Sequence, residues 1–330
     1  MLYPAIVGIG HHYPRGVLEN SHFAERFQLS DEWIVERTGV RRRHIAEDQE
    51  ATSDLIVPAA IDCLRMADRR PADVDVIIVA TVTPDHLFPS TAALVQHRIG
   101  ARRAWAFDLS ASSAGFVFAL AMARSLVLSG DATSVLVCGA DKMSSIANKE
   151  DAATAILFGD AAGVALIEAG ADDVGIIDVA SRSDGAGATF LRMPAGGSRK
   201  PATVETVLAR EHCLVQDGPT IFRAAVSMMS DICTALMFRN DLKAGDIDWL
   251  VPHQANRRIM DAVAAHLSVP PERTMSNIED VGNTWAASIP ACLSEWQQAG
   301  RLHHGQRLLL ASFGAGFCAA GAYLRWAIAR

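Results

Sequence analysis

Small polar residues between positions 110 and 115 form the first segment that could carry chemistry. A short apolar strand is expected to end at Leu109, and a long buried helix is expected to begin near Ser113. Because a helix N-terminus offers free N–H groups and a positive dipole, it favours a nucleophile and the oxyanion that the nucleophile generates. The alternative is that the serines only cap a tightly packed helix. The G-x-S-x-G turn of serine hydrolases is absent, because residue 111 is alanine.

Three later segments place donor groups or small residues just after predicted strands or turns. His253 follows a strand at 249–251, and loops at the carboxyl ends of strands build sites in open α/β sheets, although a lone histidine is as often structural. Asn283 follows a glycine and either caps a turn or donates to a carbonyl oxygen beside His253. The segment 312–317 either brings backbone N–H groups close to a substrate or forms a tight turn.

Alternating strand and helix patterns predict the elements that hold these groups. The apolar runs lack polar alternation, which indicates strands covered on both faces, as in a parallel sheet between helices. The sequence therefore predicts an α/β layered fold. Strands are expected at 76–81, 104–109, 134–138, 249–251 and 307–310, with a helix at 114–129.

A faint internal repeat predicts a duplicated chain. Residues 73–78 (DVDVII) resemble residues 246–251 (DIDWLV), at an offset of about half the chain. We therefore expect two halves, 1–170 with the nucleophile and 171–330 with the histidine and asparagine, packed as one unit. The stretch 182–206 is rich in Gly, Ser and Pro, which is typical of an insertion or a lid-like loop.

Composition excludes several classes of protein. Half of the 330 residues are hydrophobic, which excludes a disordered chain, and the net charge of −7 argues against a broad nucleic-acid surface. The six cysteines form no C-x-x-C pair, so we expect reduced thiols in a cytoplasmic protein and no zinc or other metal. No secretory signal is found, and no uninterrupted apolar run reaches the length of a membrane span, so no membrane association is expected.

Taken in order along the chain, these segments resemble beta-ketoacyl-ACP synthase III of the thiolase superfamily. The resemblance runs nearly end to end, and the motifs VPHQAN at 251–256 and GNT-x-AASIP at 282–290 are its most specific parts. The other matching segments are GIG at 8–10, DEWI at 31–34, RTGV at 37–40, residues 81–90, FGDAAG at 158–163 and FGAGF at 313–317.

The resemblance implies a duplicated five-layered α-β-α-β-α fold, a homodimer and a Cys–His–Asn active site that needs no cofactor. His253 and Asn283 match the family's histidine and asparagine, whereas the family's cysteine falls on Ser113. The implied reaction takes an acyl-CoA primer, transfers its acyl group to the enzyme, and condenses it with malonyl-ACP as carbon dioxide leaves. The implied acyl oxyanion hole is formed by the backbone N–H groups of Ser113 and Ala315.

Further positions are assigned by the same resemblance. Trp33, Arg37, Phe222 and Arg258 are expected to bind CoA or pantetheine, and an arginine frequent in the family is replaced by Ala152. The residues expected to contact the acyl carrier protein are Arg223, Arg257 and Arg258, for which ordinary solvated charge is the alternative. The expected acyl pocket is lined by Val82, Leu87, Phe88, Met143 and Phe317, which favours a short neutral acyl group. Lys142 beside it leaves room for a glutaryl-type primer, as in biotin precursor synthesis.

Serine at position 113 admits two explanations. In one, a native cysteine has been replaced to stop turnover, and the otherwise intact motif favours this explanation. In the other, the serine is natural, as in family members of aromatic polyketide pathways that use a serine ester or act as acyltransferases. A serine alcohol is far less acidic than a thiol and needs a strong general base.

Three functions are weighed. The leading one is a carbon–carbon bond-forming condensing enzyme of fatty acid or polyketide synthesis. The second is a family acyltransferase that moves an acyl group to a hydroxyl or amine without decarboxylation. The third is a non-catalytic acyl-binding subunit that has lost its nucleophile.

Overall fold

A computed structural model describes residues 3–170 and 173–329, and its centre consists of two stacked sheets. The first sheet has the strand order β1-β7-β6-β4-β5, in which β4 runs parallel to β5 and β6, and β7 runs antiparallel to β1 and β6. Its strands are β1 (Pro4–His12), β4 (Val76–Ala80), β5 (Trp105–Leu109), β6 (Ser134–Asp141) and β7 (Ala161–Ala169).

The second sheet has the order β11-β12-β13-β8, with β11 parallel to β12 and the other pairs antiparallel. Its strands are β8 (Gly175–Ser183), β11 (Trp249–Pro252), β12 (Arg307–Gly314) and β13 (Cys318–Arg325). The strands predicted from the sequence are confirmed within a few residues at their ends, and both sheets are mixed rather than all parallel.

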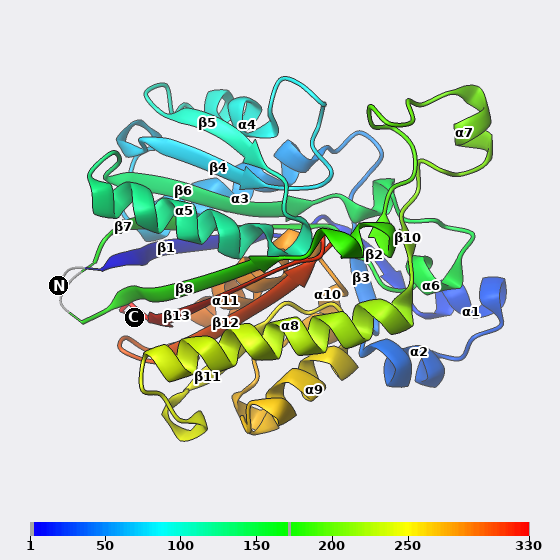
Figure 1. Cartoon of the computed structure of the whole chain (residues 1–330). Helices are drawn as coiled ribbons and strands as arrows, with labels where there is room; N and C mark the ends of the chain where they lie inside the picture. Colours follow the sequence, from blue (N-terminus) through cyan, green and yellow to red (C-terminus); the bar gives the residue numbers. More distant parts are fainter. Residues whose placement is uncertain (1–2, 171–172, 330) are drawn as a thin grey trace.

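Helices form three layers around the two sheets, which confirms the expected α-β-α-β-α order (Figure 1). One outer layer packs on the first sheet, the central layer lies between the sheets, and the other outer layer packs on the second sheet. The layers consist of α3 (Thr52–Met66) with α4 (Thr91–Ile99), α5 (Gly115–Ser129) with α11 (Ser288–Gln298), and α8 (Gly218–Arg239) with α9 (Arg257–His266).

The main core fills the space between the sheets. Side chains of α5 and α11, such as Phe116 and Leu293, pack there with strand residues from both sheets, such as Val137 and Leu310. Within the described residues, the segments Ser112–Ser129 and Gly218–Arg239 are long and apolar enough to cross a membrane. Both pack against sheets in this chain, and core helices of water-soluble proteins pass the same test, so they are weak evidence of a membrane span.

The internal repeat found in the sequence corresponds to a repeated local structure. A 3-10 turn, Pro71–Asp73, precedes β4, and a matching turn, Ala244–Asp246, precedes β11. In each turn the last aspartate accepts a hydrogen bond from the backbone N–H three residues earlier, at 3.0 Å in the first and 2.8 Å in the second. All strands of the first sheet lie between Pro4 and Ala169, and those of the second lie between Gly175 and Arg325. The predicted boundary at 170/171 borders residues outside the described part and stays a prediction.

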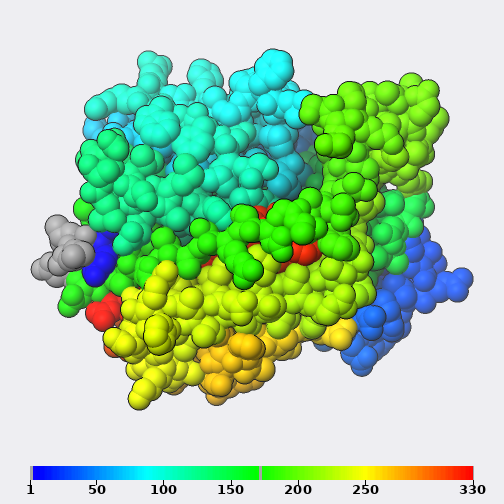
Figure 2. Space-filling model, viewed as in Figure 1, coloured from blue at the N-terminus to red at the C-terminus, as the bar shows by residue number. Residues whose placement is uncertain are grey.

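Smaller elements surround one end of the sheets. Figure 2 shows the region around α7 standing out from the body, in agreement with the expected insertion. These elements are β2 (Gly16–Glu19), α1 (Ser21–Phe27), α2 (Asp31–Thr38), β3 (Arg42–Ile45), α6 (Ala152–Ala155), β9 (Leu191–Arg192), α7 (Val204–Leu208), β10 (Val215–Gln216) and α10 (Ile278–Val281).

Candidate active site

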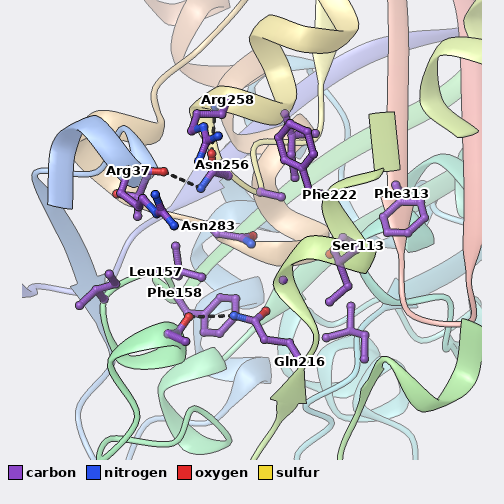
Figure 3. Close-up of a pocket in the computed structure, with 18 of the residues that line it drawn as sticks. Arg37, Ser113, Leu157, Phe158, Gln216, Phe222, Asn256, Arg258, Asn283 and Phe313 are labelled. Atoms are coloured by element: carbon purple, nitrogen blue, oxygen red, sulfur yellow. Dashed lines mark hydrogen bonds between the residues drawn. The ribbon is translucent and has the colours of Figure 1, made fainter. Parts of the chain in front are cut away.

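Ser113, His253 and Asn283 line one cavity of about 620 Å³, although they come from three distant segments. Figure 3 shows the cavity, with Ser113 at the right of the view and Asn283 near the centre. Arg37 lies at the left and Arg258 at the top. The side chains of Ser113, His253 and Asn283 are all buried, with exposed fractions of 5%, 3% and 5%. A group held between them is therefore shielded from bulk water, which strengthens hydrogen bonds to developing charge.

Ser113 lies in the 3-10 turn Ser112–Ala114 that leads directly into α5. The preceding Ser112 has a left-handed φ of 54°, which turns the chain sharply between β5 and the helix. Gly314 at the end of β12 lies against this turn: a Cβ there would stand 2.8 Å from the Ser113 backbone nitrogen. Only glycine therefore allows the two backbones to approach this closely.

His253 follows β11, and its backbone N–H donates to the Ala311 carbonyl oxygen at 2.7 Å. Burial lowers the pKa of His253 to about 3, so the imidazole is neutral at physiological pH. Its Nδ1 atom has no hydrogen-bond partner among the described residues. The ring is therefore neutral and can serve as a donor or an acceptor toward a ligand.

Asn283 is fixed on both sides by backbone contacts. Its backbone N–H donates to the Leu157 carbonyl oxygen at 2.9 Å, and its carbonyl oxygen accepts from the Gly159 N–H at 3.1 Å. Its side-chain Oδ1 accepts from the backbone N–H of Trp285 at 3.0 Å. Because the oxygen is engaged, the carboxamide has its Nδ2 group left for donation to a ligand.

The buried carboxyl of Asp141 ties the Asn283 loop to the first sheet. It accepts from the backbone N–H of Ala286 at 3.1 Å and of Val82 at 2.8 Å, and from the hydroxyls of Thr81 and Thr83. Burial raises the pKa of Asp141 to about 6, and the four hydrogen bonds oppose that rise. This carboxyl lies at the end of β6 and so holds segments of both halves together.

The cavity wall carries three arginines and no carboxylate among the residues that the structure describes there. The guanidinium of Arg37 lies 5.7 Å from the Trp33 ring, and that of Arg258 lies 5.7 Å from the Phe222 ring. Arg223 is the third. Exposed arginines beside aromatic faces suit a ligand that carries phosphates and a flat base.

The Arg37 side of the wall is linked to the His253 motif. Asn256 donates from Nδ2 to the Arg37 carbonyl oxygen at 3.0 Å, as Figure 3 shows. Ala152 also lines the cavity. Arg257 is not among the residues that line the cavity, and its Cβ lies beside Gly39 at the end of α2.

The structure corrects the predicted acyl wall. Leu87 and Phe88 are 87% and 85% exposed and do not line the cavity of this chain. Their loop is anchored by Asp85, whose carboxylate accepts from the Ser53 N–H and hydroxyl, and the residues after it project outward. Lys142 is also removed from the cavity, because its Nζ donates to the carbonyl oxygens of Glu47 and Glu50.

The remaining predicted wall residues lie one layer behind the cavity surface. Met143 is fully buried in a cluster with Val82 and Ala315 packed against it, and Phe317 lies behind Phe313 with ring centroids 5.0 Å apart. None of the three remaining predicted wall residues, Val82, Met143 and Phe317, lines the cavity. The apolar wall consists instead of Ile156, Leu157, Phe158, Leu191, Ile221, Trp285 and Phe313.

Comparison with known proteins decides the family. Residues 107–185 match the model of 3-oxoacyl-[acyl-carrier-protein] synthase III, and residues 237–326 match that of its C-terminal part. The chain is 47% identical over 325 residues to beta-ketoacyl-[acyl-carrier-protein] synthase III of Chlorobium chlorochromatii, covering 98% of this chain and 99% of that protein. This chain belongs to the beta-ketoacyl-ACP synthase III family. The corresponding protein of Solibacter usitatus is 46% identical over 98% of each chain.

Solved structures of the synthase III family share the fold. The enzyme of Pseudomonas aeruginosa superposes with a TM-score of 0.90 at 39% identity over 98% of each chain. The priming beta-ketosynthase of the R1128 polyketide pathway superposes with a TM-score of 0.91 at 33% identity, covering 98% of this chain and 96% of that one. These likenesses confirm the thiolase-like fold expected from the sequence.

Within this synthase III chain, sequence reasoning missed several residues of the cavity. Asn256 and Trp285 lie inside the two motifs that carried the resemblance, so their positions were a usable signal. Phe313 begins the matching segment at 313–317 and so carried a signal as well, whereas Gln216 carried none, because ordinary polar residues are found on any surface. No group of three or more His, Cys, Asp or Glu side chains suited to a metal is found in the described ranges, and the absence of a metal requirement stays a prediction.

Proposed function

We propose that this chain condenses a short acyl-CoA primer with malonyl-ACP to give 3-oxoacyl-ACP and carbon dioxide. The observation that carries the proposal is the convergence of Ser113, His253 and Asn283 on one shielded cavity with arginines along its wall. Membership of the synthase III family supports the same reaction. No metal or redox group takes part in the chemistry as proposed.

The first step is acyl transfer to Ser113. The hydroxyl oxygen attacks the thioester carbonyl carbon, a C–O bond forms, the C–S bond breaks, and the hydroxyl proton leaves with CoA as a thiol. The start of α5 supports this step, because its free N–H groups and dipole favour an oxyanion. We assign the oxyanion contacts to the backbone N–H groups of Ser113 and Ala315.

The second step is decarboxylation followed by condensation. The bond between the α-carbon and the carboxylate carbon of the malonyl group breaks, and carbon dioxide leaves. The electron pair of that bond stays on the α-carbon and forms the enolate of the thioester. Neutral His253 and the Nδ2 group of Asn283 donate hydrogen bonds to that enolate oxygen in the proposed mechanism. The carbanion then attacks the acyl ester, the C–O bond breaks, and the Ser113 oxygen regains a proton.

A serine makes the first step slow. Removing the proton of an alcohol needs a strong base, and a histidine with a pKa of about 3 is a weak one. A cysteine at this helix start would ionise far more readily, because its ordinary pKa is near 8.5 and the dipole lowers it further. Ser113→Cys is therefore expected to raise the acylation rate by about 10²-fold or more.

Intact-protein mass spectrometry after incubation with a panel of short acyl-CoAs tests the proposal. The unchanged chain and the Ser113→Cys variant are compared, with release of carbon dioxide from malonyl-ACP measured in parallel. Acylation and malonyl-dependent turnover only in the variant support replacement of a native cysteine. Turnover of the unchanged chain supports a natural serine nucleophile. Failure of both proteins to take up an acyl group overturns the proposal.

The arginines support the assignment of the donor and carrier sites. We assign Trp33 and Arg37 to the adenine end of CoA, and Phe222 and Arg258 to the pantetheine arm and its phosphate. We assign Arg223 and Arg258, with Arg257 nearby, to the acidic surface of the carrier protein. Arginine matches phosphate geometry with paired donors, which supports this distribution.

We also propose that two copies associate along β5. This strand ends its sheet, so one row of its backbone groups has no strand beside it in the described chain. Trp105 on it is 51% exposed and stacks on Phe107 at 5.5 Å, and Met122 and Leu128 of α5 are exposed as well. A free edge with apolar neighbours favours pairing with a second copy. Sedimentation equilibrium of the chain and of Trp105→Glu tests this, and a monomeric unchanged chain would contradict it.

Polyketide priming is a second candidate for the pathway. The likeness to the R1128 priming beta-ketosynthase favours it, and the same condensation chemistry would serve. Comparing turnover with fatty-acid and polyketide carrier proteins separates the two candidates, because only the partner protein differs. A preference for the polyketide carrier supports priming, and a preference for the fatty-acid carrier contradicts it.

A further inference from the structure

Trp285 is a bulky aromatic residue at the point where the Asn283 loop meets the cavity wall. It lines the same cavity as Ser113 and Asn283, and it is only 4% exposed. The arginines and Trp33 of the same cavity are exposed at the surface. The indole ring therefore belongs to the closed, apolar end, where an acyl chain attached to Ser113 would extend.

Packing fixes the ring in place. It meets Phe158 edge to face, with ring centroids 5.4 Å apart and an interplanar angle of 67°. Met143, Leu191 and Leu214 belong to the same buried cluster. Because these neighbours pack around the ring, it cannot change rotamer freely. A ligand therefore cannot occupy the volume that the ring fills.

Two local features show that this tryptophan is unfavourable for folding. Its φ of 54° lies in the left-handed region, which a bulky L-residue rarely adopts. Its indole N–H is buried and has no hydrogen-bond partner among the described residues, which costs free energy. By contrast, Trp249 donates to Gln306 at 3.3 Å and Trp326 donates to Gln297 at 2.7 Å.

A residue that combines backbone strain with an unpaired donor is not chosen for stability, and such conflicts concentrate at functional sites. The Trp285 backbone N–H that holds Asn283 is available with any residue other than proline at this position. The side chain is therefore not needed for that contact. What the indole contributes to the cavity is its volume.

We propose that Trp285 determines the length of the acyl group, by closing the apolar end of the cavity so that only short, neutral primers fit. The proposal rests on the proposed function, since it concerns the acyl group that would be carried by Ser113. Lys142 donates to backbone carbonyls elsewhere, and the cavity arginines are exposed, so none of the described residues places a cation at this end to bind a carboxylated primer.

The test compares the unchanged chain with Trp285→Ala and Trp285→Phe over straight-chain acyl-CoAs from two to ten carbons. Acylation is followed by mass spectrometry, on the Ser113→Cys background if the serine form is slow. Trp285→Ala is expected to move the preferred chain to longer primers, with a gain of about 4-fold in kcat/KM for each added methylene that becomes buried. Trp285→Phe, which keeps most of the bulk, is expected to keep the short-chain preference.

A binding readout separates chain length from catalysis. S-alkyl-CoA thioethers of the same lengths cannot acylate the enzyme, and their dissociation constants by calorimetry are expected to follow the same shift in Trp285→Ala. Trp249→Ala removes the same volume outside the cavity and is expected to leave the length profile unchanged. An unchanged profile in Trp285→Ala, by both readouts, overturns the inference while leaving the proposed function intact. Absence of acyl transfer with every chain in every protein overturns the proposed function instead.

Discussion

Replacement of Gln254 is expected to disturb His253 and Asn283 together. Gln254 directly follows His253, and its carboxamide is buried. Its Oε1 accepts from the backbone N–H groups of Asn277 at 2.8 Å and Ile278 at 2.9 Å, at the start of α10. That helix leads into Gly282 and Asn283. One side chain thus joins the loops that carry both donors of the proposed decarboxylation.

The expected magnitude follows from the groups left without partners. Gln254→Leu keeps a similar volume but leaves the N–H groups of Asn277 and Ile278 unpaired, at a cost of about 1–3 kcal/mol each. The free energy of unfolding is therefore expected to fall by about 2–6 kcal/mol, which corresponds to a fall in Tm of roughly 3–9 °C for a chain of this size. Gln254→Glu retains the acceptor oxygen but replaces the Nε2 donor, which binds Asn277 Oδ1 at 2.7 Å, with a second oxygen, so a fall is expected for this variant as well.

Two half-reactions distinguish misplacement of the donors from general damage. Release of carbon dioxide from malonyl-ACP is expected to fall by about 10²-fold in Gln254→Leu, because misaligned donors stabilise the enolate poorly. Acylation of Ser113 depends on a different part of the cavity and is expected to fall far less. Gln298→Leu makes the same change at an exposed position and serves as the control. A Gln254→Leu variant with an unchanged Tm, or with equal losses in both half-reactions, would refute the reasoning.

Three further outcomes are expected. His253→Ala removes one enolate donor, so carbon dioxide release is expected to fall by about 10²-fold or more while acylation persists; equal rates of carbon dioxide release would contradict this. Because folding lowers the pKa of His253 from 6.5 to about 3, its contribution to the free energy of unfolding is complete above pH 6.5 and is lost as the pH falls toward 3. Denaturant titrations should show that the unchanged chain loses about 2 kcal/mol more than His253→Ala between pH 6.5 and 5. Arg258→Ala is expected to raise the KM for acyl-CoA several-fold with little change in kcat, an effect that added salt should diminish. A change in kcat alone would count against a binding role for Arg258.

The sequence by itself determined the reactive groups and the elements that carry them. Apolar runs without alternation mark buried strands in any fold of this class, so β4, β6 and β11 were predictable from local pattern. The motif around His253 and the motif around Asn283 are specific enough to indicate the family.

Only the tertiary structure decided which residues meet. Ser113 and Asn283 are 170 positions apart, and the local sequence around either residue does not indicate that the two line the same cavity. The acyl wall could not be assigned because an apolar side chain has the same pattern on a cavity surface, as Phe313 has, or one layer behind it, as Phe317 has. Burial depends on the packing of distant elements, whereas residue type and periodicity are local, and this is the physical reason for the difference.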